Sequence, residues 1–353
     1  MLLSEYAPKC KLNLTEHTVE TPAHPVIDAH GHFAGAYCPL YAGGTWERTD
    51  LAKTVEALRA RGICRAVNLD GFWDGFFGLP QEEILRVFEP FDDFFLHFVS
   101  VNTARADEPG FARDVRTHFI KAKKLGVRGI KLFKHVSIMR ETAPGVYAPG
   151  RGIRIDDPRL NVIWETAAEL ELPVLIHIAD PEAFFDPVDK YNERCRELLQ
   201  HPDWAYHGSG AYAFAELMEA QERLLSANPR TIFIVAHVGS NAENLAFVSH
   251  CLEAYPNMLI DIAARIDELG RQPYSARDFL VKWADRVLFG TDVYPETAAW
   301  LHPMYYRVLE TRDEWIPGGA WPMYGLSLPE DVLRKIYHDN AARLFGLPPL
   351  DGR

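Results

Sequence analysis

Cysteine is scarce in this chain, and the few cysteines follow no pairing pattern. The five residues are odd in number and widely scattered, and none belongs to a C-x-x-C pair. This usage argues against a disulfide framework and is typical of free thiols in a reducing compartment. Long apolar runs are also lacking, because residues 1–25 hold no apolar signal segment and no later run reaches membrane-spanning length. We therefore expect a soluble, cytoplasmic protein that does not bind membranes.

Positive charge is in the minority. Lys and Arg number 37 against 49 Asp and Glu, which gives a formal net charge of −12. Surfaces that bind nucleic acid are normally basic, so this balance argues against a nucleic-acid partner. No G-x-G-x-x-G follows the first apolar run, which weakens a dinucleotide-binding interpretation. The remaining composition, 48% hydrophobic and 24% charged, is ordinary for a globular protein with a large core.

Eight short apolar runs alternate with amphipathic segments along the chain. Nearly continuous apolar runs are typical of parallel strands that are covered on both faces. The predicted strands are 26–32, 63–70, 94–102, 127–133, 173–178, 231–238, 258–263 and 287–292. Eight strand–helix units in a chain of this length predict an α/β fold, the (β/α)8 or TIM barrel, as a single domain. An open, doubly wound sheet is the alternative.

The connections between these elements favour the barrel. Links from helix to strand are short, whereas links from strand to helix are long, and a barrel enzyme builds its active site from the latter. The longest predicted loops are 134–157, 179–212 and 293–327. We expect an irregular leader at 1–25, the barrel domain at 26–347 and a short tail at 348–353.

Side chains that bind metals stand at the ends of several predicted strands. They are His30, His32, Lys131, His177, His237 and Asp292. Burying one such group without a partner costs roughly 1–3 kcal/mol, whereas one cation satisfies several of them together. If the barrel closes, all of these strand ends meet at one rim, so the pattern predicts a divalent metal site. The alternative is that each group has a separate polar partner.

The first strand carries the clearest part of this pattern. Alternate side chains of a strand share a face, so Asp28, His30 and His32 are expected to point the same way. Two imidazoles held by one strand can bind a single divalent cation.

The chain resembles the amidohydrolase superfamily, and in particular the group that contains ring-opening lactonases and non-oxidative decarboxylases. The matching segments are Ile27-Asp28-Ala29-His30-Gly31-His32, Gly129-Ile130-Lys131-Leu132, Leu175-Ile176-His177, Ala236-His237-Val238-Gly239, Phe289-Gly290-Thr291-Asp292 and Asn340-Ala341-Ala342-Arg343-Leu344-Phe345-Gly346-Leu347. In this order the segments are specific for the superfamily but not for a substrate.

The resemblance implies a role for each strand-end residue. His30, His32, His177 and Asp292 would bind a divalent metal, most often Zn²⁺. Asp292 would also accept a proton from the water that the metal activates, and pass it to the leaving group. His237 would polarise the substrate carbonyl or orient the water, and in a two-metal site it would be a ligand of the second ion.

Lys131 and three further residues are candidates for substrate binding. In two-metal relatives a lysine on this strand is carboxylated and bridges the ions, whereas in others it binds substrate or forms a structural ion pair. His135 follows Lys131 on the same predicted face. Arg265 could hold a substrate carboxylate through its planar guanidinium or brace a loop through a salt bridge. Tyr294 lies in a rim loop.

Other polar and aromatic residues of the loops carry weaker signals. Trp73, Phe76 and Phe77 could cover the substrate or merely pack within their loop. Cys38 has no paired histidine and so no case as a nucleophile. His302, expected in the loop 293–327, matches no motif.

The favoured function is a metal-dependent hydrolase that attacks a lactone or amide carbonyl of a small substrate, one that carries a carboxylate. A metal-dependent, non-oxidative decarboxylase of an aromatic or unsaturated carboxylic acid is the first alternative. A metal-containing barrel that binds a ligand without catalysis is the second. The resemblance also raises the expectation of a homodimer, on which the charge pattern is silent.

Overall fold

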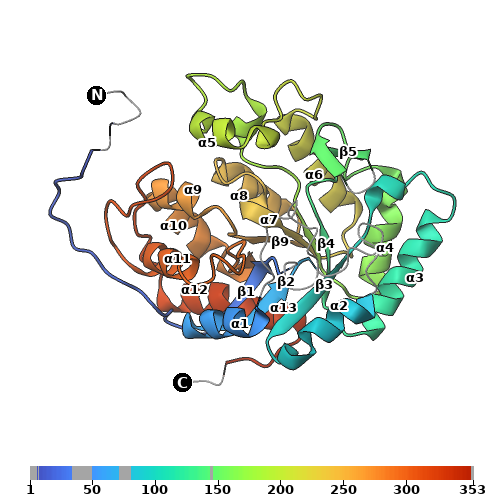
Figure 1. Cartoon of the computed structure of the whole chain (residues 1–353), viewed down its shortest axis with the longest axis horizontal. Coiled ribbons are helices and arrows are strands. Elements are labelled where there is room, and N and C mark those ends of the chain that lie inside the picture. The colour runs from blue at the N-terminus through green and yellow to red at the C-terminus, as the bar shows by residue number, and fades with distance from the viewer. Residues whose placement is uncertain (1–5, 7, 34–49, 71–80, 144–145, 351–353) are drawn as a thin grey trace.

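Eight parallel strands form a nearly closed barrel, which confirms the predicted TIM-barrel fold (Figure 1). The computed structural model describes residues 6, 8–33, 50–70, 81–143 and 146–350. Neighbours in the sheet follow the order β1-β2-β3-β4-β7-β8-β9-β10. The strands are β1 (Val26–Gly31), β2 (Ile63–Asn68), β3 (Phe95–Ser100), β4 (Gly129–Leu132), β7 (Val174–Ile176), β8 (Phe233–Val235), β9 (Met258–Asp261) and β10 (Val287–Leu288).

The barrel closes where the last strand meets the first. The Ala29 N–H donates to the Phe289 carbonyl at 2.9 Å, and the Asp292 N–H donates to the His30 carbonyl at 3.0 Å. A parallel bridge joins Gly31 to Val293 just beyond β10. This seam, which we call the β1–β10 seam, therefore brings the first and last predicted ligand strands into direct contact.

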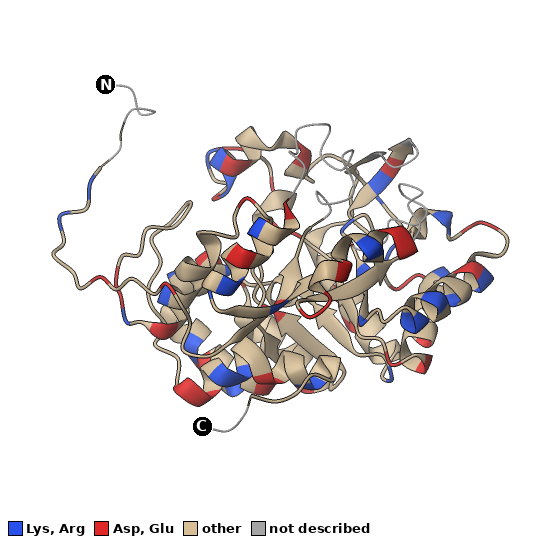
Figure 2. Cartoon of the chain, turned by 60° about the horizontal axis from the view of Figure 1, so that its bottom comes forward, with Lys and Arg blue, Asp and Glu red and all other residues tan. Residues whose placement is uncertain are grey.

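Helices surround the strands. They are α1 (Leu51–Ala60), α2 (Gln81–Phe88), α3 (Phe111–Lys124), α4 (Asn161–Glu169), α6 (Phe214–Ala227), α8 (Leu245–Ala254) and α10 (Pro273–Lys282). Asp50 caps α1, because its side chain accepts from the N–H groups of Ala52 and Lys53. Acidic and basic side chains are interspersed along these outer helices (Figure 2).

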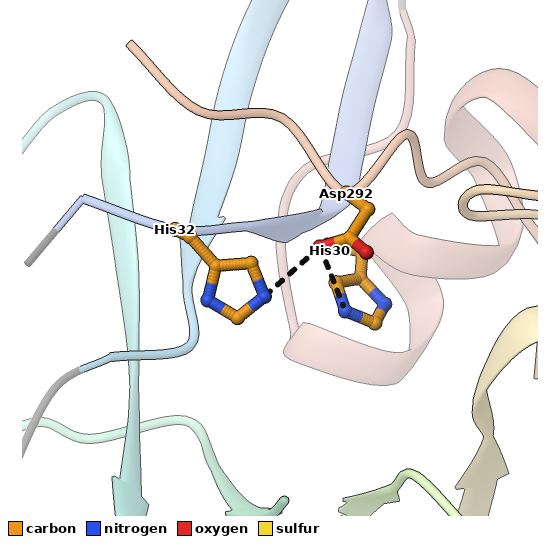
Figure 3. Close-up of side chains that lie close together, drawn as sticks. All are labelled: His30, His32 and Asp292. Atoms are coloured by element: carbon orange, nitrogen blue, oxygen red, sulfur yellow. Dashed lines mark ion pairs between the residues drawn. The ribbon is translucent and has the colours of Figure 1, made fainter. Parts of the chain in front are cut away.

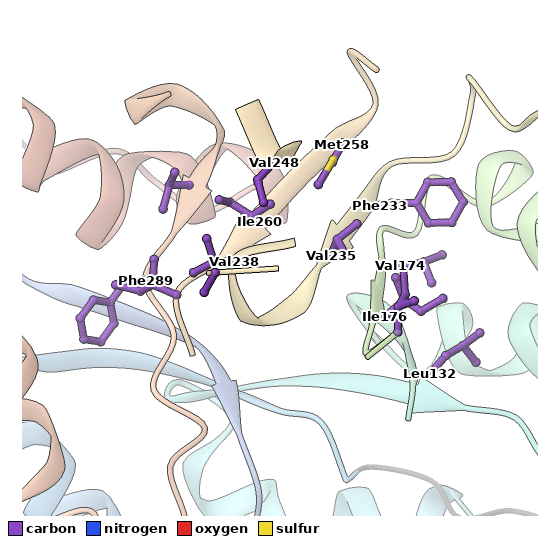
Figure 4. Close-up of a cluster of buried hydrophobic side chains, with 14 of the residues drawn as sticks. Leu132, Val174, Ile176, Phe233, Val235, Val238, Val248, Met258, Ile260 and Phe289 are labelled. Atoms are coloured by element: carbon purple, nitrogen blue, oxygen red, sulfur yellow. The ribbon is translucent and has the colours of Figure 1, made fainter. Parts of the chain in front are cut away.

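Two apolar layers hold the barrel together. Outward-facing strand residues such as Val174, Ile176 and Val235 pack against the helices (Figure 4). Inward-facing residues such as Leu175 and Ile234 fill the barrel, and Phe345 belongs to the same inner cluster. Phe345 lies on α13 (Asn340–Phe345), which follows α12 (Glu330–Arg334) and a π-helical stretch at Lys335–Asp339. The π-helical stretch thus separates two short α-helices.

The long strand-to-helix segments contain more regular structure than the sequence predicts. The segment 134–157 holds an antiparallel hairpin of β5 (Met139–Ala143) and β6 (Val146–Pro149). The segment 179–212 holds α5 (Cys195–Gln200), and 293–327 holds α11 (Leu301–Glu310). The segment α7 (Ala236–Gly239) after β8 is a turn in which His237 and Val238 have left-handed backbone angles, and the short helix α9 (Ile266–Arg271) follows β9. The expectation that 134–157, 179–212 and 293–327 are simple loops is wrong.

Residues 8–25 belong to no helix or strand and run along the outside of the barrel. The His17 N–H donates to the Asp313 carboxylate at 2.7 Å, which fastens this segment to the chain after α11. Of the other candidate residues, Cys38, Trp73, Phe76 and Phe77 lie outside the described residues. Among the described residues, no helix has both the length and the apolar character needed to cross a membrane.

Candidate metal centre

Three of the predicted ligands converge at the carboxyl end of the β1–β10 seam. Asp292 Oδ1 lies 3.0 Å from His32 Nε2 and 3.7 Å from His30 Nε2. Figure 3 shows both imidazole rings directed towards the Asp292 carboxylate. The two histidines are buried, whereas the Asp292 side chain remains 26% exposed. One nitrogen from each ring and one carboxylate oxygen lie within 4.8 Å of one another, as a metal site requires.

His30 of β1 and His32, just beyond this strand, each have the other ring nitrogen tied to a buried carboxylate. His30 Nδ1 lies 2.9 Å from Asp261 Oδ2, and His32 Nδ1 lies 2.6 Å from Asp70 Oδ1. Because an ionised carboxylate only accepts hydrogen bonds, both Nδ1 atoms carry the hydrogen. Each Nε2 therefore presents a lone pair towards Asp292 when its imidazole is neutral. Metal-binding histidines are normally oriented in this way.

His237 and His177 are oriented in the same way, each with one ring nitrogen bonded to an oxygen acceptor. His237 Nδ1 donates to the Ala263 carbonyl at 2.9 Å, and His177 Nε2 faces Asp180 Oδ1 at 3.0 Å. The two remaining nitrogens, His237 Nε2 and His177 Nδ1, then face each other at 3.1 Å. Two lone pairs at this distance repel unless a proton or a cation lies beside them.

The low pKa values of both rings favour a metal ion over a proton between these two nitrogens. Burial lowers the pKa of His177 to about 4, although Asp180 acts in the opposite direction. Burial also lowers the pKa of His237 well below its ordinary value, and the neighbouring His177 and Arg265 lower it further. Both rings are therefore neutral near pH 7, and a metal ion is the cation that suits two imidazole lone pairs.

The charges around Asp292 suit the same cation. Burial would raise the pKa of its carboxyl, but His30 and His32 outweigh burial and hold the pKa well below its ordinary value. For His32, burial by itself would lower the pKa. The carboxylates of Asp70 and Asp292 outweigh burial and raise this pKa to about 9. Asp292 Oδ1 pairs with both imidazoles, at 3.0 Å from His32 Nε2 and 3.7 Å from His30 Nε2. An ionised oxygen between two imidazoles, whose ring protons a cation can replace, fits a divalent metal ion.

Strained backbone gathers at this rim. Asp292, His237 and Ala264 have positive φ angles of 64°, 60° and 50°, a region that side-chain-bearing residues rarely occupy. All three lie within four residues after the end of a barrel strand. Such strain persists only where the surroundings enforce it, and it concentrates at functional sites.

Sequence reasoning missed three carboxylates that orient the imidazoles. Asp70 and Asp261 lie at the carboxyl ends of predicted strands, so the signal that identified the histidines could have identified them too. Asp261 Oδ1 also accepts from the His237 N–H at 2.9 Å. Asp180 lies three residues beyond His177 and accepts from Lys134 Nζ at 3.1 Å. Burial would raise the pKa of Asp180, but Lys134 and His177 hold it well below the ordinary value.

The prediction that Asp28 shares a face with His30 and His32 is wrong. The pairing of β1 with β2 shifts register between Asp28 and Gly31, which breaks the alternation of the strand. Ile27 and Ala29 belong to the inner apolar cluster, whereas Asp28 Oδ2 lies 2.8 Å from His302 Nε2 of α11. Asp28 therefore contacts the helical layer and is not a metal ligand.

The candidate substrate-binding residues from β4 lie beside this centre. Lys131 is buried, with Nζ 5.2 Å from the centre of the Phe133 ring. Burial lowers the pKa of Lys131 to about 8, while the charges of Asp292, Asp261 and Asp70 act against that change. The His135 ring lies 5.2 Å from the Tyr147 ring of β6, and burial together with Lys131 lowers the pKa of His135 to about 3.

Tyr294 lies next to His32, and Arg265 lies close enough to His237 to affect its pKa. The Tyr294 ring stacks on the His32 ring, with 5.1 Å between centroids and 22° between planes. Arg265 is buried, donates to the Ala264 carbonyl at 2.7 Å and lowers the pKa of His237. The structure thus places each sequence-predicted site residue at one rim, although their roles stay predictions.

The model of the amidohydrolase family matches residues 27–347. The chain therefore belongs to the amidohydrolase family, whose members generally depend on metal ions. No curated protein matches the sequence.

Several solved structures share the fold at low sequence identity. An uncharacterized TIM-barrel protein from Bordetella bronchiseptica is 17% identical, with a TM-score of 0.58, over 91% of this chain and 98% of that chain. A 2,6-dihydroxybenzoate decarboxylase from Rhizobium is 18% identical, with a TM-score of 0.54, over 92% and 99% of the two chains. A probable 2-pyrone-4,6-dicarboxylic acid hydrolase from Acinetobacter baumannii is 13% identical, with a TM-score of 0.50, over 92% and 100%. These likenesses concern the fold alone.

Proposed function

We propose that this protein is a metal-dependent hydrolase that opens a lactone or amide bond of a small substrate bearing a carboxylate. The observation that carries the proposal is the orientation of the imidazoles, each of which ties one ring nitrogen to an acceptor and turns the other inwards. His30, His32, His177 and Asp292 would hold the metal, and Zn²⁺ suits this donor set. When bound, such a metal lowers the pKa of water and polarises a carbonyl group.

The protein's own groups supply the proton transfers. The depressed pKa of Asp292 keeps its carboxylate ionised at neutral pH, so it can accept a proton from the attacking water and deliver it to the leaving group. His237 carries its hydrogen on Nδ1, which leaves Nε2 to orient that water or to complete the metal site. Arg265, Lys131, His135 and Tyr294 would bind the substrate, with the guanidinium of Arg265 suited to a carboxylate.

Decarboxylation of an aromatic or unsaturated carboxylic acid is the second candidate. The aromatic surroundings of His32 favour it, because Tyr294 stacks on this ring and the Phe133 ring lies 6.1 Å from it. A flat acid could lie against such a wall. The fold that the chain shares with a hydrolase and with a decarboxylase is compatible with both reactions.

The two reactions differ in their products. Purified protein is loaded with Zn²⁺ and assayed against a panel of lactones and cyclic amides and against a panel of hydroxybenzoates, with CO2 release measured in each. Ring opening without CO2 supports the hydrolase, and CO2 release supports the decarboxylase instead.

Asp292→Asn separates catalysis from simple binding. At saturating metal, with the bound metal measured, kcat should fall by about 10²–10⁴-fold, because the proton acceptor is lost. A variant that keeps its metal and all detectable activity would favour a non-catalytic role for the barrel centre. The exposed Asp93, which pairs with Arg59, provides the control Asp93→Asn.

A further inference from the structure

The Asp28 carboxylate joins the two strands that form the β1–β10 seam. Asp28 Oδ1 accepts from the His30 N–H at 3.1 Å and from the Thr291 N–H at 3.2 Å. Asp28 Oδ2 accepts from the Thr291 hydroxyl at 2.6 Å. One carboxylate without solvent exposure therefore fixes the backbone of His30 and of the residue that precedes Asp292.

A histidine from outside the barrel completes this junction. His302 lies on α11, has no solvent exposure, and donates from Nε2 to Asp28 Oδ2 at 2.8 Å. The donor assignment follows because the carboxylate only accepts. Its ring packs 6.3 Å from the Phe289 ring, so the side chain is enclosed by apolar neighbours apart from this bond and the Thr291 hydroxyl at 3.5 Å.

Asp292 needs such support because of its backbone. Its φ of 64° is strained, and the turn is held against β1 by main-chain hydrogen bonds from the Asp292 and Val293 N–H groups to the His30 carbonyl and from the His32 N–H to the Val293 carbonyl. The Asp28–Thr291 bonds act one residue before the strained position. A change of the Asp28 carboxylate would therefore alter both the His30 and the Asp292 sides of the metal centre.

We propose that His302 is a positioning residue that holds His30 and Asp292 in register through Asp28 and Thr291. It thereby couples α11, which is part of the rim segment 293–327, to the metal centre. The inference rests on the proposed function, because it assigns His302 a purpose only if that centre binds metal. It corrects the expectation that His302 lies in a loop, since the residue belongs to α11.

The test measures metal affinity apart from activity. Metal-free wild type, His302→Leu and His302→Gln compete with a chromophoric chelator for Zn²⁺, and thermal unfolding is recorded for each. We expect His302→Leu to bind Zn²⁺ about tenfold more weakly, at the lower end of the range for lost partners of metal ligands. Glutamine can place an N–H near the position of Nε2, so His302→Gln should recover most of the affinity.

Controls separate positioning from packing. His338 is also buried and contacts Asp339, in the π-helical stretch, so His338→Leu should lower stability without changing Zn²⁺ affinity. If His302→Leu does not fold, His302→Asn, whose amide is too short to reach Asp28, should show the same weakened binding. With any substrate that the wild-type protein turns over, His302→Leu and His302→Asn should lower kcat and leave KM unchanged.

Two results overturn the inference, and they differ from each other. Wild-type affinity in His302→Leu or His302→Asn, with lowered stability alone, would make His302 a packing residue and leave the proposed function intact. A wild-type protein that binds no Zn²⁺ would overturn the proposed function together with this inference. Thr291→Val, which removes the other side-chain donor to Asp28, should combine non-additively with His302→Leu if both act through that carboxylate.

Discussion

At the scale of single residues, the candidate metal centre depends on side chains other than its proposed ligands. Asp70, Asp261 and Asp180 each accept a hydrogen bond from one imidazole and so determine which ring nitrogen is left with a lone pair. A carboxylate in this position also makes the imidazole a stronger ligand. The orientation of the four rings is thus set by Asp70, Asp180, Asp261 and the Ala263 carbonyl, which lie at or just beyond the ends of three strands.

Asp70→Asn tests this dependence. The amide can still accept a hydrogen bond from His32 but carries no charge, so we expect Zn²⁺ affinity to fall by about 10–100-fold. The pKa of His32 should also fall from about 9, which NMR titration of the metal-free protein would detect. Asp93→Asn, at an exposed carboxylate, should change neither quantity. Unchanged affinity in Asp70→Asn would show that the orientation of His32 has another cause.

At the scale of elements, the hairpin of β5 and β6 forms the side of the site next to His135. Gly152 follows the hairpin, and a Cβ there would lie 2.4 Å from the Met139 carbonyl oxygen and 2.6 Å from that of His135. Both atoms belong to the backbone and cannot rotate away. The hairpin therefore requires glycine at this position to pack against the turn that carries His135.

Gly152→Ala should displace this turn. We expect the free energy of unfolding to fall by about 1–3 kcal/mol, the usual cost of overpacking, and KM to rise because His135 moves. Zn²⁺ content should stay the same, since no predicted ligand lies on the hairpin. Gly319→Ala is the control, because its added Cβ would meet only an Asp267 oxygen at 3.3 Å. Chemical denaturation and metal analysis of both variants measure these effects, and wild-type stability and KM in Gly152→Ala would contradict the account.

The buried carboxylate of Asp313 is one of the groups that fasten the segment 8–25 to the barrel. Asp313 accepts from the His17 backbone and from Arg307 Nε, both at 2.7 Å. Burial would raise the pKa of Asp313, but His17 and Arg307 outweigh it and lower the pKa. A depressed pKa of this kind contributes stability above the unfolded value of about 3.9, and the contribution disappears as pH falls through the folded pKa.

Asp313→Asn should therefore destabilise the protein most at neutral pH. We expect a loss of about 1–3 kcal/mol at pH 7 and a smaller difference from wild type as the pH falls below about 4. Denaturation curves at several pH values give this difference, and hydrogen exchange should speed up at residues 17–24. A difference that grows towards acid pH would contradict the depressed pKa.

At the scale of the whole molecule, the metal centre joins strands that are far apart in sequence. Its candidate ligands follow or lie on β1, β7, β8 and β10, so a bound ion links the two ends of the barrel across the β1–β10 seam. Removing the metal with a chelator should lower the unfolding temperature by several degrees. Metal at a thousandfold excess over its Kd should stabilise the fold by about 4 kcal/mol. Equal unfolding temperatures with and without metal would argue against a site that spans the seam.

The sequence predicted the barrel because buried parallel strands leave long apolar runs, and it predicted the ligand types because each stands at the end of such a run. It did not predict the partners of those ligands. His30 and Asp261 come from strands at opposite ends of the chain, and no local pattern connects them. The register shift after Asp28 and the positive φ of Asp292 also lack a local signal, since neither position is glycine. The rim helices were missed because loop-like Pro and Gly residues surround short helical stretches.

The metal content of each chain tests the central claim most directly. Elemental analysis is made on wild type and Lys131→Ala, both purified without added metal. The account predicts about one divalent ion per chain in both proteins, bound by His30, His32, His177 and Asp292. Two ions in wild type that fall to one or none in Lys131→Ala would instead make Lys131 a bridging ligand and His237 a ligand of the second metal. No metal in either protein, even after reconstitution with Zn²⁺, would contradict the account.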